Sequence, residues 1–361
     1  MTTIYKIGKD LGVSPMTVSN ALNYRKNVAE KTALRIREYA KKIGYQPSHM
    51  ARSLSKGRTK TIGICLRASP RNPHYSSILD ILSQRVREMG YTLNIMLTNG
   101  QLDQVRQALT QLAEHRVEAV VIGPLGYMHQ YKELEQELSR LPNVQVFAAV
   151  ENLPADYSMQ DVYRGSQEVL GHLHDLGHRK IGYAGAIEME TQLPGVRNRY
   201  TAYRDTLNLY RLPYSADWLI LEEQCCLGFN FHMVDQLAKL LKERYEKCHQ
   251  DMPTGWLCHN DWVAAQLIKA LKQLNLSVPD DVSVVGMGNQ SICIITEPTI
   301  TTCAYDIDVY VNHMADLIVK RLKLEPESEE KPLPQGQQVV NVIEPQLILR
   351  GSSGPAPSQA R

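Results

Sequence analysis

Residues 3–23 constrain this chain more than any other stretch of its sequence. They read TIYKIGKDLGVSPMTVSNALN, which predicts two short helices joined by a tight turn at Gly12. Ser14 followed by Pro15 marks the start of the second helix, because the serine hydroxyl accepts from an unpaired N–H and proline tolerates the first helical position. Apolar residues recur at helical spacing in both helices: Ile4, Ile7 and Leu11 in the first, and Val18, Ala21 and Leu22 in the second.

Charge is distributed unevenly along the chain. Residues 1–60 hold 13 Lys and Arg against 3 Asp and Glu, whereas the rest of the chain holds 27 against 35. A strongly basic head on an acidic body is typical of a phosphate-binding module joined to a second domain. A small bihelical unit with a polar outer face and this charge predicts a DNA-binding helix-turn-helix. The alternative is a solvated basic helical hairpin.

The head continues through a third helix into a linker. Residues 30–43 carry apolar side chains along one helical face, and Gly44 ends this helix. Pro47 forces an extended break, after which residues 48–56 form a nine-residue helix candidate. A helix this short is marginal in water, so we expect it to fold on DNA.

From residue 61 onward, short apolar strands alternate with amphipathic helices. This alternation predicts an α/β fold with parallel sheets. About 280 residues suit two similar doubly wound sheets of five or six strands with a ligand cleft between them. The expected strands are 61–66, 93–97, 119–123, 144–150, 180–186, 217–221, 255–260 and 281–287, and the expected helices are 78–89, 102–114, 131–139, 165–176, 197–209, 233–245 and 262–274.

Composition and spacing argue against several other classes of protein. The chain has no apolar start typical of a secretory signal and no membrane-length apolar run, so we expect a cytoplasmic protein. Seven cysteines without a Cys-x-x-Cys spacing argue against a disulfide framework or a zinc site. No cofactor, metal or enzymatic activity is expected. His172, His174 and His178 include one pair at i, i+4 spacing that could bind a metal, but no third ligand of suitable spacing appears. Cys258 and His259 are neighbours on a predicted strand, so they point to opposite faces and cannot simply pair as a thiol nucleophile and its base.

Motifs along nearly the whole chain resemble the lactose-repressor/purine-repressor (LacI) family of transcription regulators. The resemblance rests on their order and spacing, since each motif alone is weak. They are VSxxTVSxALN (13–23), GYxP (44–47), ARSL (51–54), TIG (61–63), GHRKIG (177–182), ND (260–261), PDDVSVVG (279–286), PTITT (298–302) and LIxRxSS (347–353).

The resemblance implies how the chain is organised. It implies a head (1–46), a hinge (47–60) and a periplasmic-binding-protein-like core (61–350) that binds an effector and forms dimers. The core divides into a first subdomain of about 61–163 and 293–323 and a second of about 164–292 and 324–350. Helices 78–89 and 102–114 are the expected dimer surface. The tail, 351–361, is rich in Gly, Ser and Pro, which predicts disorder and no tetramer-forming coiled coil.

The resemblance also assigns contacts to DNA. The implied partner is a pseudo-palindromic operator. Met16 offers apolar contact to a thymine methyl and Asn20 offers a bidentate pair to adenine, whereas Pro15, the third base-facing residue, offers no donor. The hinge helix, which carries Ala51 and Leu54, is expected to lie in the minor groove, where Leu54 wedges into the central base step. The residues expected at phosphates or sugars are Thr3, Ser14, Thr17, Asn23 and Tyr45. For Thr17, helix capping or solvent exposure is the alternative, and for Leu54, packing on the core.

For the effector, the resemblance implies residues at strand ends on both sides of the cleft. They are Asn72, His74, Tyr75, Arg197, Arg199, Asp261 and Asn289, with Arg199 the better match to the family's ligand arginine. Asp261 has an alternative role as the N-cap of the helix at 262–274. The family's usual Phe/Tyr-Asp pair after Gly286 is replaced by Met287-Gly288-Asn289, so an acceptor carboxylate is missing and Asn289 substitutes for it only in part.

The sequence therefore predicts a dimeric, sequence-specific transcription regulator, a repressor by resemblance, switched by a sugar or a related metabolite. A regulator that responds to a purine or another non-sugar is the alternative. A small-molecule binding protein of periplasmic type shares the core, but the basic head argues against it. The sequence leaves open the effector, the operator and whether the effector promotes or releases DNA binding.

Overall fold

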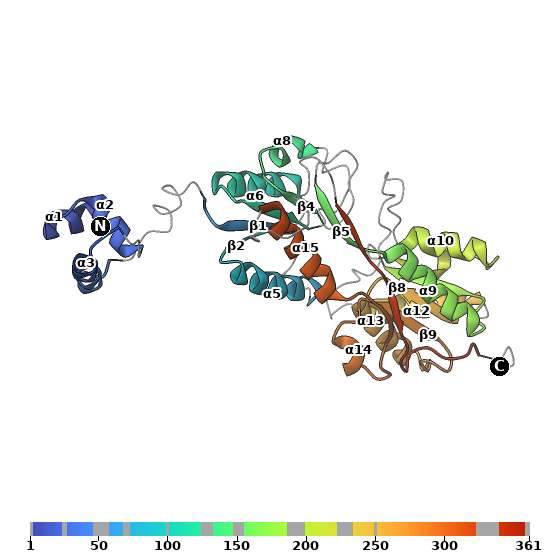
Figure 1. The fold of residues 1–361 in the computed structure, drawn as a ribbon. Helices are drawn as coiled ribbons and strands as arrows, with labels where there is room; N and C mark the ends of the chain where they lie inside the picture. The colour runs from blue at the N-terminus through green and yellow to red at the C-terminus, as the bar shows by residue number, and fades with distance from the viewer. Residues whose placement is uncertain are drawn as a thin grey trace. The chain divides into compact units, whose positions relative to one another are not determined.

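The computed structural model describes residues 3–23, 27–45, 58–67, 73–98, 101–123, 133–146, 155–185, 199–221, 234–248, 251–322 and 339–357. It separates into a head, Met1–Lys60, and a core, Thr61–Arg361 (Figure 1). The predicted hinge helix at 48–56, with Ala51 and Leu54, lies outside the described residues.

The head contains the three predicted helices: α1 (Ile4–Leu11), α2 (Pro15–Leu22) and α3 (Glu30–Lys42). Gly12 follows α1 with a φ of 67°, the left-handed conformation predicted for the turn. The apolar faces meet in a small buried cluster of Ile7, Val18, Ala21, Ala33, Ile36 and Ala40. A cluster this small leaves most side chains of the head on its surface.

Within the described residues, the core contains two six-stranded sheets, as predicted. The first sheet has the strand order β11-β5-β4-β3-β1-β2, and the second β12-β10-β9-β8-β6-β7. The pairs are parallel except for β10 with β12. The first sheet comprises β1 (Thr61–Arg67), β2 (Thr92–Thr98), β3 (Ala119–Ile122), β4 (Val144–Val146), β5 (Asp156–Gln160) and β11 (Val340–Ile343). The second comprises β6 (Ile181–Gly185), β7 (Leu219–Leu221), β8 (Gly255–Cys258), β9 (Ser283–Met287), β10 (Thr301–Ala304) and β12 (Gln346–Ile348).

Helices cover both faces of each sheet. On the first sheet, Ile62 and Ile64 of β1 share a cluster with α5 (Pro73–Glu88) and α15 (Ile307–Leu322), and Cys65 shares another with α6 (Leu102–Glu114). On the second, α9 (Val162–Asp175) and α10 (Arg199–Leu209) lie on one face, and α12 (Val234–Cys248) and α13 (Asp261–Gln273) on the other. The cluster under α5 and α15 also includes residues of the second sheet, so apolar packing joins the two sheets.

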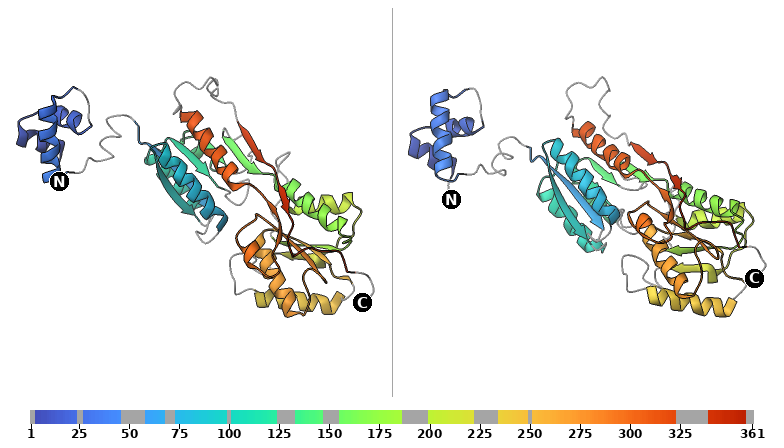
Figure 2. Two further views of the ribbon diagram at one scale, coloured as in Figure 1. Left: turned by 60° about the horizontal axis from the view of Figure 1, so that its bottom comes forward. Right: turned by 90° about the horizontal axis from the view of Figure 1, so that it is seen from below.

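The chain crosses between the sheets after Gln160, after Ala304 and after Ile343, which Figure 2 shows from two further sides. These crossings correct two predicted subdomain boundaries. β10 belongs to the second sheet, although 293–323 was assigned to the first subdomain. β11 belongs to the first sheet, although 324–350 was assigned to the second subdomain. The sheet to which β10 or β11 belongs depends on its pairing with strands distant in the sequence, and the local sequence does not reveal such pairing.

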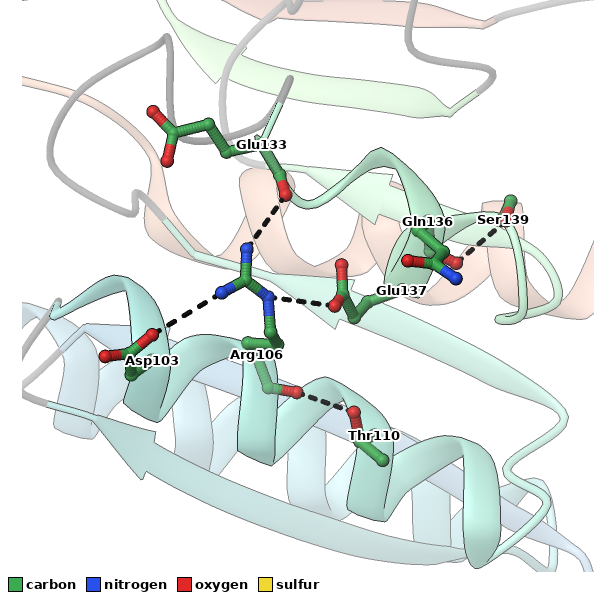
Figure 3. A network of polar contacts seen from close by, with 7 residues as sticks. All are labelled: Asp103, Arg106, Thr110, Glu133, Gln136, Glu137 and Ser139. Atoms are coloured by element: carbon green, nitrogen blue, oxygen red, sulfur yellow. Dashed lines mark hydrogen bonds and ion pairs between the residues drawn. The ribbon is translucent and has the colours of Figure 1, made fainter.

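Several elements, most of them short, were not predicted. They are β5, α14 (Ile292–Ile295), β10, α15, β11 and β12, and a 3₁₀ turn at Ala216–Trp218 precedes β7. Of the predicted helix at 131–139, the described part contains only α8 (Glu135–Leu138). Arg106 of α6 holds this short helix: its guanidinium donates to Glu137 at 2.9 Å and to the Glu133 carbonyl at 3.2 Å, and it also pairs with Asp103 (Figure 3).

The predicted disorder of the tail is wrong for residues 351–357. Ser352 is fully buried: its hydroxyl accepts from the Thr301 N–H at 2.9 Å and its carbonyl from the Val284 N–H at 2.8 Å. Ala356 donates to the Leu176 carbonyl at 2.8 Å. The Gly354 carbonyl faces His178 Nε2 at 3.1 Å, and Ser353 Oγ lies 2.9 Å from His172 Nε2. The small residues that suggested disorder instead let this segment pack closely on the second sheet.

Candidate functional site: a DNA-reading head and an effector site in the core

The start of α2 is built by its own residues and by a close contact with α1. The Ser14 hydroxyl accepts from the Thr17 N–H at 3.0 Å, as predicted, and Pro15 occupies the first turn. Gly8 lies under this turn, where an added Cβ would meet the Val13 carbonyl oxygen at 2.7 Å. A glycine is therefore required there to bring α1 and α2 together.

The three predicted base-reading residues differ in exposure. Met16 is 68% exposed and Pro15 is partly exposed, so both lie at the surface of the head. Asn20 is only 8% exposed, although it lies one helical turn after Met16. Of these three residues, Met16 has the most exposed side chain, and the amide of Asn20 is largely covered.

The predicted backbone-contact residues hold helix ends. Thr3 accepts from the Lys6 N–H at 3.3 Å, Ser14 and Thr17 share a 2.8 Å hydroxyl contact, and Asn23 Nδ2 donates to the Ser19 carbonyl at 2.8 Å. The alternative of capping for Thr17 thus has a structural basis. Tyr45 is partly buried against the head's apolar cluster.

The amino ends of α1 and α2 suit an anion. Both helices are capped by a hydroxyl, and neither carries an acidic residue in its first turn. Because the N–H groups and the dipole of a helix favour negative charge at its start, these two ends are compatible with phosphates.

Tyr5, beside the Thr3 cap, is 70% exposed and was missed by the sequence analysis, although its place between the apolar Ile4 and Ile7 indicated an outward side chain.

In the core, two predicted effector residues on different helices lie close enough for the charge of one to act on the other. His74 lies at the start of α5, and Arg199 is the first residue of α10. Burial, followed by the nearby charge of Arg199, lowers the pKa of His74 from 6.5 to about 4. The imidazole is therefore neutral at physiological pH. Tyr75 packs edge-on to His74, with ring centroids 5.4 Å apart.

Two residues beside Arg199 were not predicted. Its charge also acts on Cys303 and Tyr305, which lie at and just after β10. The Tyr305 hydroxyl donates to the Asp161 carbonyl at 3.1 Å, and an added Cβ on Gly165 would come within 2.1 Å of that hydroxyl oxygen. Since β10 itself was not predicted, its neighbours could not be placed. The predicted residues Asn72 and Arg197 lie outside the described residues.

Asp261 is fully buried and bonded within the protein. Its carboxylate accepts from the Thr302 hydroxyl at 2.5 Å and from the Gln290 N–H at 2.8 Å. Burial is the largest influence on its pKa and raises it, while these hydrogen bonds act in the opposite direction. The alternative role as N-cap is wrong, because Asn260 caps α13 by accepting from the Val263 N–H.

The segment after β9 folds around this carboxylate. Gly288 has a φ of 118°, and an added Cβ there would lie 3.3 Å from Asp261 Oδ2. Asn289 follows with a φ of 51°, and its side-chain oxygen accepts from Arg350 at 2.6 Å. The amide oxygen that was expected to replace the missing acceptor thus accepts from Arg350, which lies two residues after β12.

The groups considered for catalysis or metal binding are also occupied or buried. Cys258 is fully buried, and burial raises its pKa far above 9.0, so its thiol stays protonated. His178 is buried between Thr254 Oγ1 and the Gly354 carbonyl. Within the described ranges, no group of three or more His, Cys, Asp and Glu residues is arranged to hold a metal ion. In the same ranges, no helix has the length and apolar character needed to cross a membrane.

Comparison with known protein families places both parts of the chain. Residues 3–48 match the lacI family of bacterial regulatory proteins, and residues 170–353 match the periplasmic binding protein-like domain. A helix-turn-helix head joined to such a domain defines a ligand-responsive, DNA-binding transcription regulator. The chain belongs to the lacI family.

Relatives and solved structures agree with this assignment. The chain is 29% identical over 302 residues to the HTH-type transcriptional repressor PurR of Mannheimia succiniciproducens, covering 84% of this chain and 86% of that protein. It is 27% identical over 352 residues to PurR of Vibrio parahaemolyticus, covering 98% of each.

Among solved structures, the lac repressor dimer bound to operator and the anti-inducer ONPF aligns with a TM-score of 0.77 at 19% identity, covering 98% of this chain and 99% of that one. The complex of the transcriptional regulator CelR with cellobiose aligns with a TM-score of 0.65 at 20% identity, covering 98% of this chain and all of that one. At these identities the two structures establish the fold of the chain.

Proposed function

We propose that this protein is a sequence-specific transcriptional repressor that binds a pseudo-palindromic operator as a dimer in the cytoplasm and has no enzymatic activity. One observation carries the proposal: the exposed start of α2, with Met16 at 68% exposure, lies in a head that holds 13 Lys and Arg against 3 Asp and Glu. The relatives named as repressors support the direction of regulation.

DNA binding is tested first on bulk DNA and then on a duplex recovered by in vitro selection with the purified protein. Fluorescence anisotropy gives the affinity for each. We expect a clear preference for the selected duplex, because specific complexes bind about 10³-fold or more tightly than non-specific ones. Equal affinity for selected and random duplexes would refute sequence-specific regulation.

A small molecule is proposed to bind beside His74, Tyr75 and Arg199. Neutral His74 offers a donor or an acceptor, Tyr75 offers an aromatic edge, and Arg199 offers a planar donor fork. A sugar or a related metabolite fits this set. The PurR relatives favour the second candidate, a purine, and the lack of a carboxylate at Gly288 argues against the usual sugar geometry.

A thermal-shift screen against sugars, sugar phosphates and purines distinguishes these candidates. A ligand at 100 times its dissociation constant adds about 2.7 kcal/mol of stability. We expect Arg199→Ala to abolish both the shift and the effect of the ligand on DNA affinity, with DNA binding itself retained. Arg204→Ala is the matched control, since Arg204 lies on the same helix with its guanidinium 3.8 Å from the centre of the Tyr214 ring. A normal response in Arg199→Ala would refute this site.

The dimer is proposed to use exposed apolar side chains of strand β2 and helix α14. Ile95 and Leu97, on the edge strand β2, are each 44% exposed, and Ile294 and Ile295 of α14 are 68% and 74% exposed. By contrast, the exposed positions of the predicted dimer helices α5 and α6 are polar. Sedimentation should give about twice the chain mass of 40.8 kDa, and Ile294→Glu should shift the protein toward monomer. A monomeric parent at micromolar concentration would contradict the dimer.

Leu54 is proposed to open the central base step from the minor groove. Leu54→Ala keeps helix propensity and removes the wedge. It should lower the affinity for the selected duplex and the bend measured by circular-permutation gel shift, with non-specific binding nearly unchanged. Parent-like bending by Leu54→Ala would indicate a packing role instead.

A further inference from the structure

We propose that Arg37, on the third helix of the head, is a positioning residue that fixes the reading helix α2 from its carboxyl end and so sets the DNA specificity of the head. The inference rests on the proposed DNA-binding function. In the sequence, Arg37 stands out only as one of the 13 basic residues of the head.

The primary observation is a hydrogen bond between two helices. Arg37 Nε donates to the carbonyl of Ala21 at 2.9 Å, and this contact is partly buried. The last four carbonyls of a helix have no partner within the helix, and a positive charge near them complements the helix dipole. Arg37 therefore adds a donor from α3 to the carboxyl end of α2. The C-cap residue Asn23 also donates there, its side chain to the Ser19 carbonyl and its backbone N–H to the Ser19 and Ala21 carbonyls.

The same helix also holds the end of α1. Arg35 Nη2 lies 3.4 Å from the Leu11 carbonyl, and the Tyr39 hydroxyl donates to Asp10 at 2.8 Å. The helix α3 thus reaches the carboxyl ends of both helices of the reading unit, and the Arg37–Ala21 bond is shorter than the Arg35–Leu11 contact. These bonds fix how α1 and α2 are oriented against α3.

Fixing the far end of α2 matters because its near end reads bases. The helix has eight residues, and Ser14 caps its start. A rotation or tilt at Ala21 would therefore move Met16, which lies five residues away. Phosphate contacts tolerate such a shift better than base contacts, because only base contacts depend on register with the base edges.

This role differs measurably from a phosphate contact. Removing a phosphate contact weakens binding to all DNA equally and reduces the slope of log affinity against log salt by about 0.9. Loss of positioning lowers the preference for the selected duplex over a random duplex and leaves that slope unchanged. A packing role alone lowers stability and changes neither quantity.

The test uses the full-length protein with Arg37→Gln, Arg37→Lys and a control, Lys42→Gln. Lys42 is exposed at the end of the same helix, so the control removes the same charge from α3. Anisotropy titrations over a range of salt, on the selected and random duplexes, give the specificity ratio and the slope for each variant.

We expect Arg37→Gln to lower the specificity ratio about tenfold, in keeping with the loss of one charge-assisted hydrogen bond, with the same slope as Lys42→Gln. Arg37→Lys keeps the charge at the helix end and should recover part of the ratio. It also keeps the test decisive if circular dichroism shows that Arg37→Gln unfolds the head.

Two results would overturn the proposal. One is an unchanged specificity ratio in both Arg37 variants, which would leave Arg37 a packing residue. The other is an equal loss on both duplexes with a reduced slope, which would make Arg37 a phosphate contact. A parent protein that prefers no duplex would instead refute the proposed function, so the two failures are distinguishable.

Discussion

The head and the core present their functional groups in opposite ways. In the head, a cluster of six buried apolar residues supports three helices, and Met16 and the hydroxyl caps lie at the surface. In the core, Asp261 is buried and Asn289 is held by Arg350, while the charge of Arg199 acts on His74 from a helix far away in the sequence. A surface that meets DNA is encoded locally, whereas a small-molecule site depends on how distant segments pack.

The sharpest way to break this comparison is to remove the tail. A chain that ends at Arg350 loses the bonds from Ser352 to Thr301 and Val284, together with those of Gly354 and Ala356. Leaving several buried partners unsatisfied should destabilise the core by on the order of 5 kcal/mol, measured by urea unfolding. The head should keep its stability. A chain that ends at Pro357 is the control and should match the parent, and equal stability of both truncated chains would contradict the packed tail.

Gly8→Ala tests the same separation from the side of the head. Alanine gains about 1 kcal/mol in helix propensity, but its Cβ would meet the Val13 carbonyl at 2.7 Å. We expect a net loss of about 2 kcal/mol in head stability and a loss of DNA binding, with core unfolding unchanged. In the control, Gly171→Ala on α9, the nearest atom to the new Cβ is the Tyr210 hydroxyl at 3.3 Å, so it should be nearly neutral. A stabilised Gly8→Ala head would show that the contact relaxes freely.

The pH dependence of core stability sharpens the comparison at the effector site. The pKa of His74 is lowered to about 4, so below 6.5 the unfolded chain binds a proton that the native site resists. Stability is therefore fully present above pH 6.5 and is lost as pH falls toward 4, by at most about 1.4 kcal/mol per pH unit for one proton. Because burial also lowers the pKa of His172 and His178, the measurement is the difference between the parent and His74→Gln. Identical pH profiles would show that His74 is not held neutral by folding.

Met16→Ala is expected to have the smallest effect. Its side chain is 68% exposed, so the free energy of unfolding should not change. Loss of an apolar contact with a thymine methyl should weaken binding to the selected duplex by about 1 kcal/mol and leave binding to random DNA unchanged. A loss on random DNA of the same size would mean that Met16 does not read a base.

Local signals predicted the head well. Ser14-Pro15, Gly12 and the apolar stripes fixed the helix ends, because capping, left-handed glycine and helical spacing act over a few residues. The exception is Asn20, whose burial depends on packing within the folded head. In the core, the number of sheets and most strands followed from apolar runs.

Long-range pairing explains what the sequence did not predict in the core. β5 and β11 pair with each other although the paired residues are 183 positions apart in the chain, as Tyr157 with Val340 illustrates. Short strands of this kind lack a distinctive pattern, and Tyr305 and Cys303 went unnoticed with β10. The tail shows the same effect, since Ser352 is buried by contacts with β9 and β10 that its Gly/Ser-rich neighbours do not suggest.

The central claim is that the basic head binds DNA while a separate core senses a ligand. The most direct test is the salt dependence of binding to a duplex selected in vitro, measured by anisotropy between 50 and 200 mM salt. Over this range, phosphate contacts dominate the change of affinity with salt. Two heads that make about six phosphate contacts between them predict a slope of about −5 in log affinity against log salt. Arg199→Ala should give the same slope. An affinity that does not change with salt would contradict DNA binding through this head.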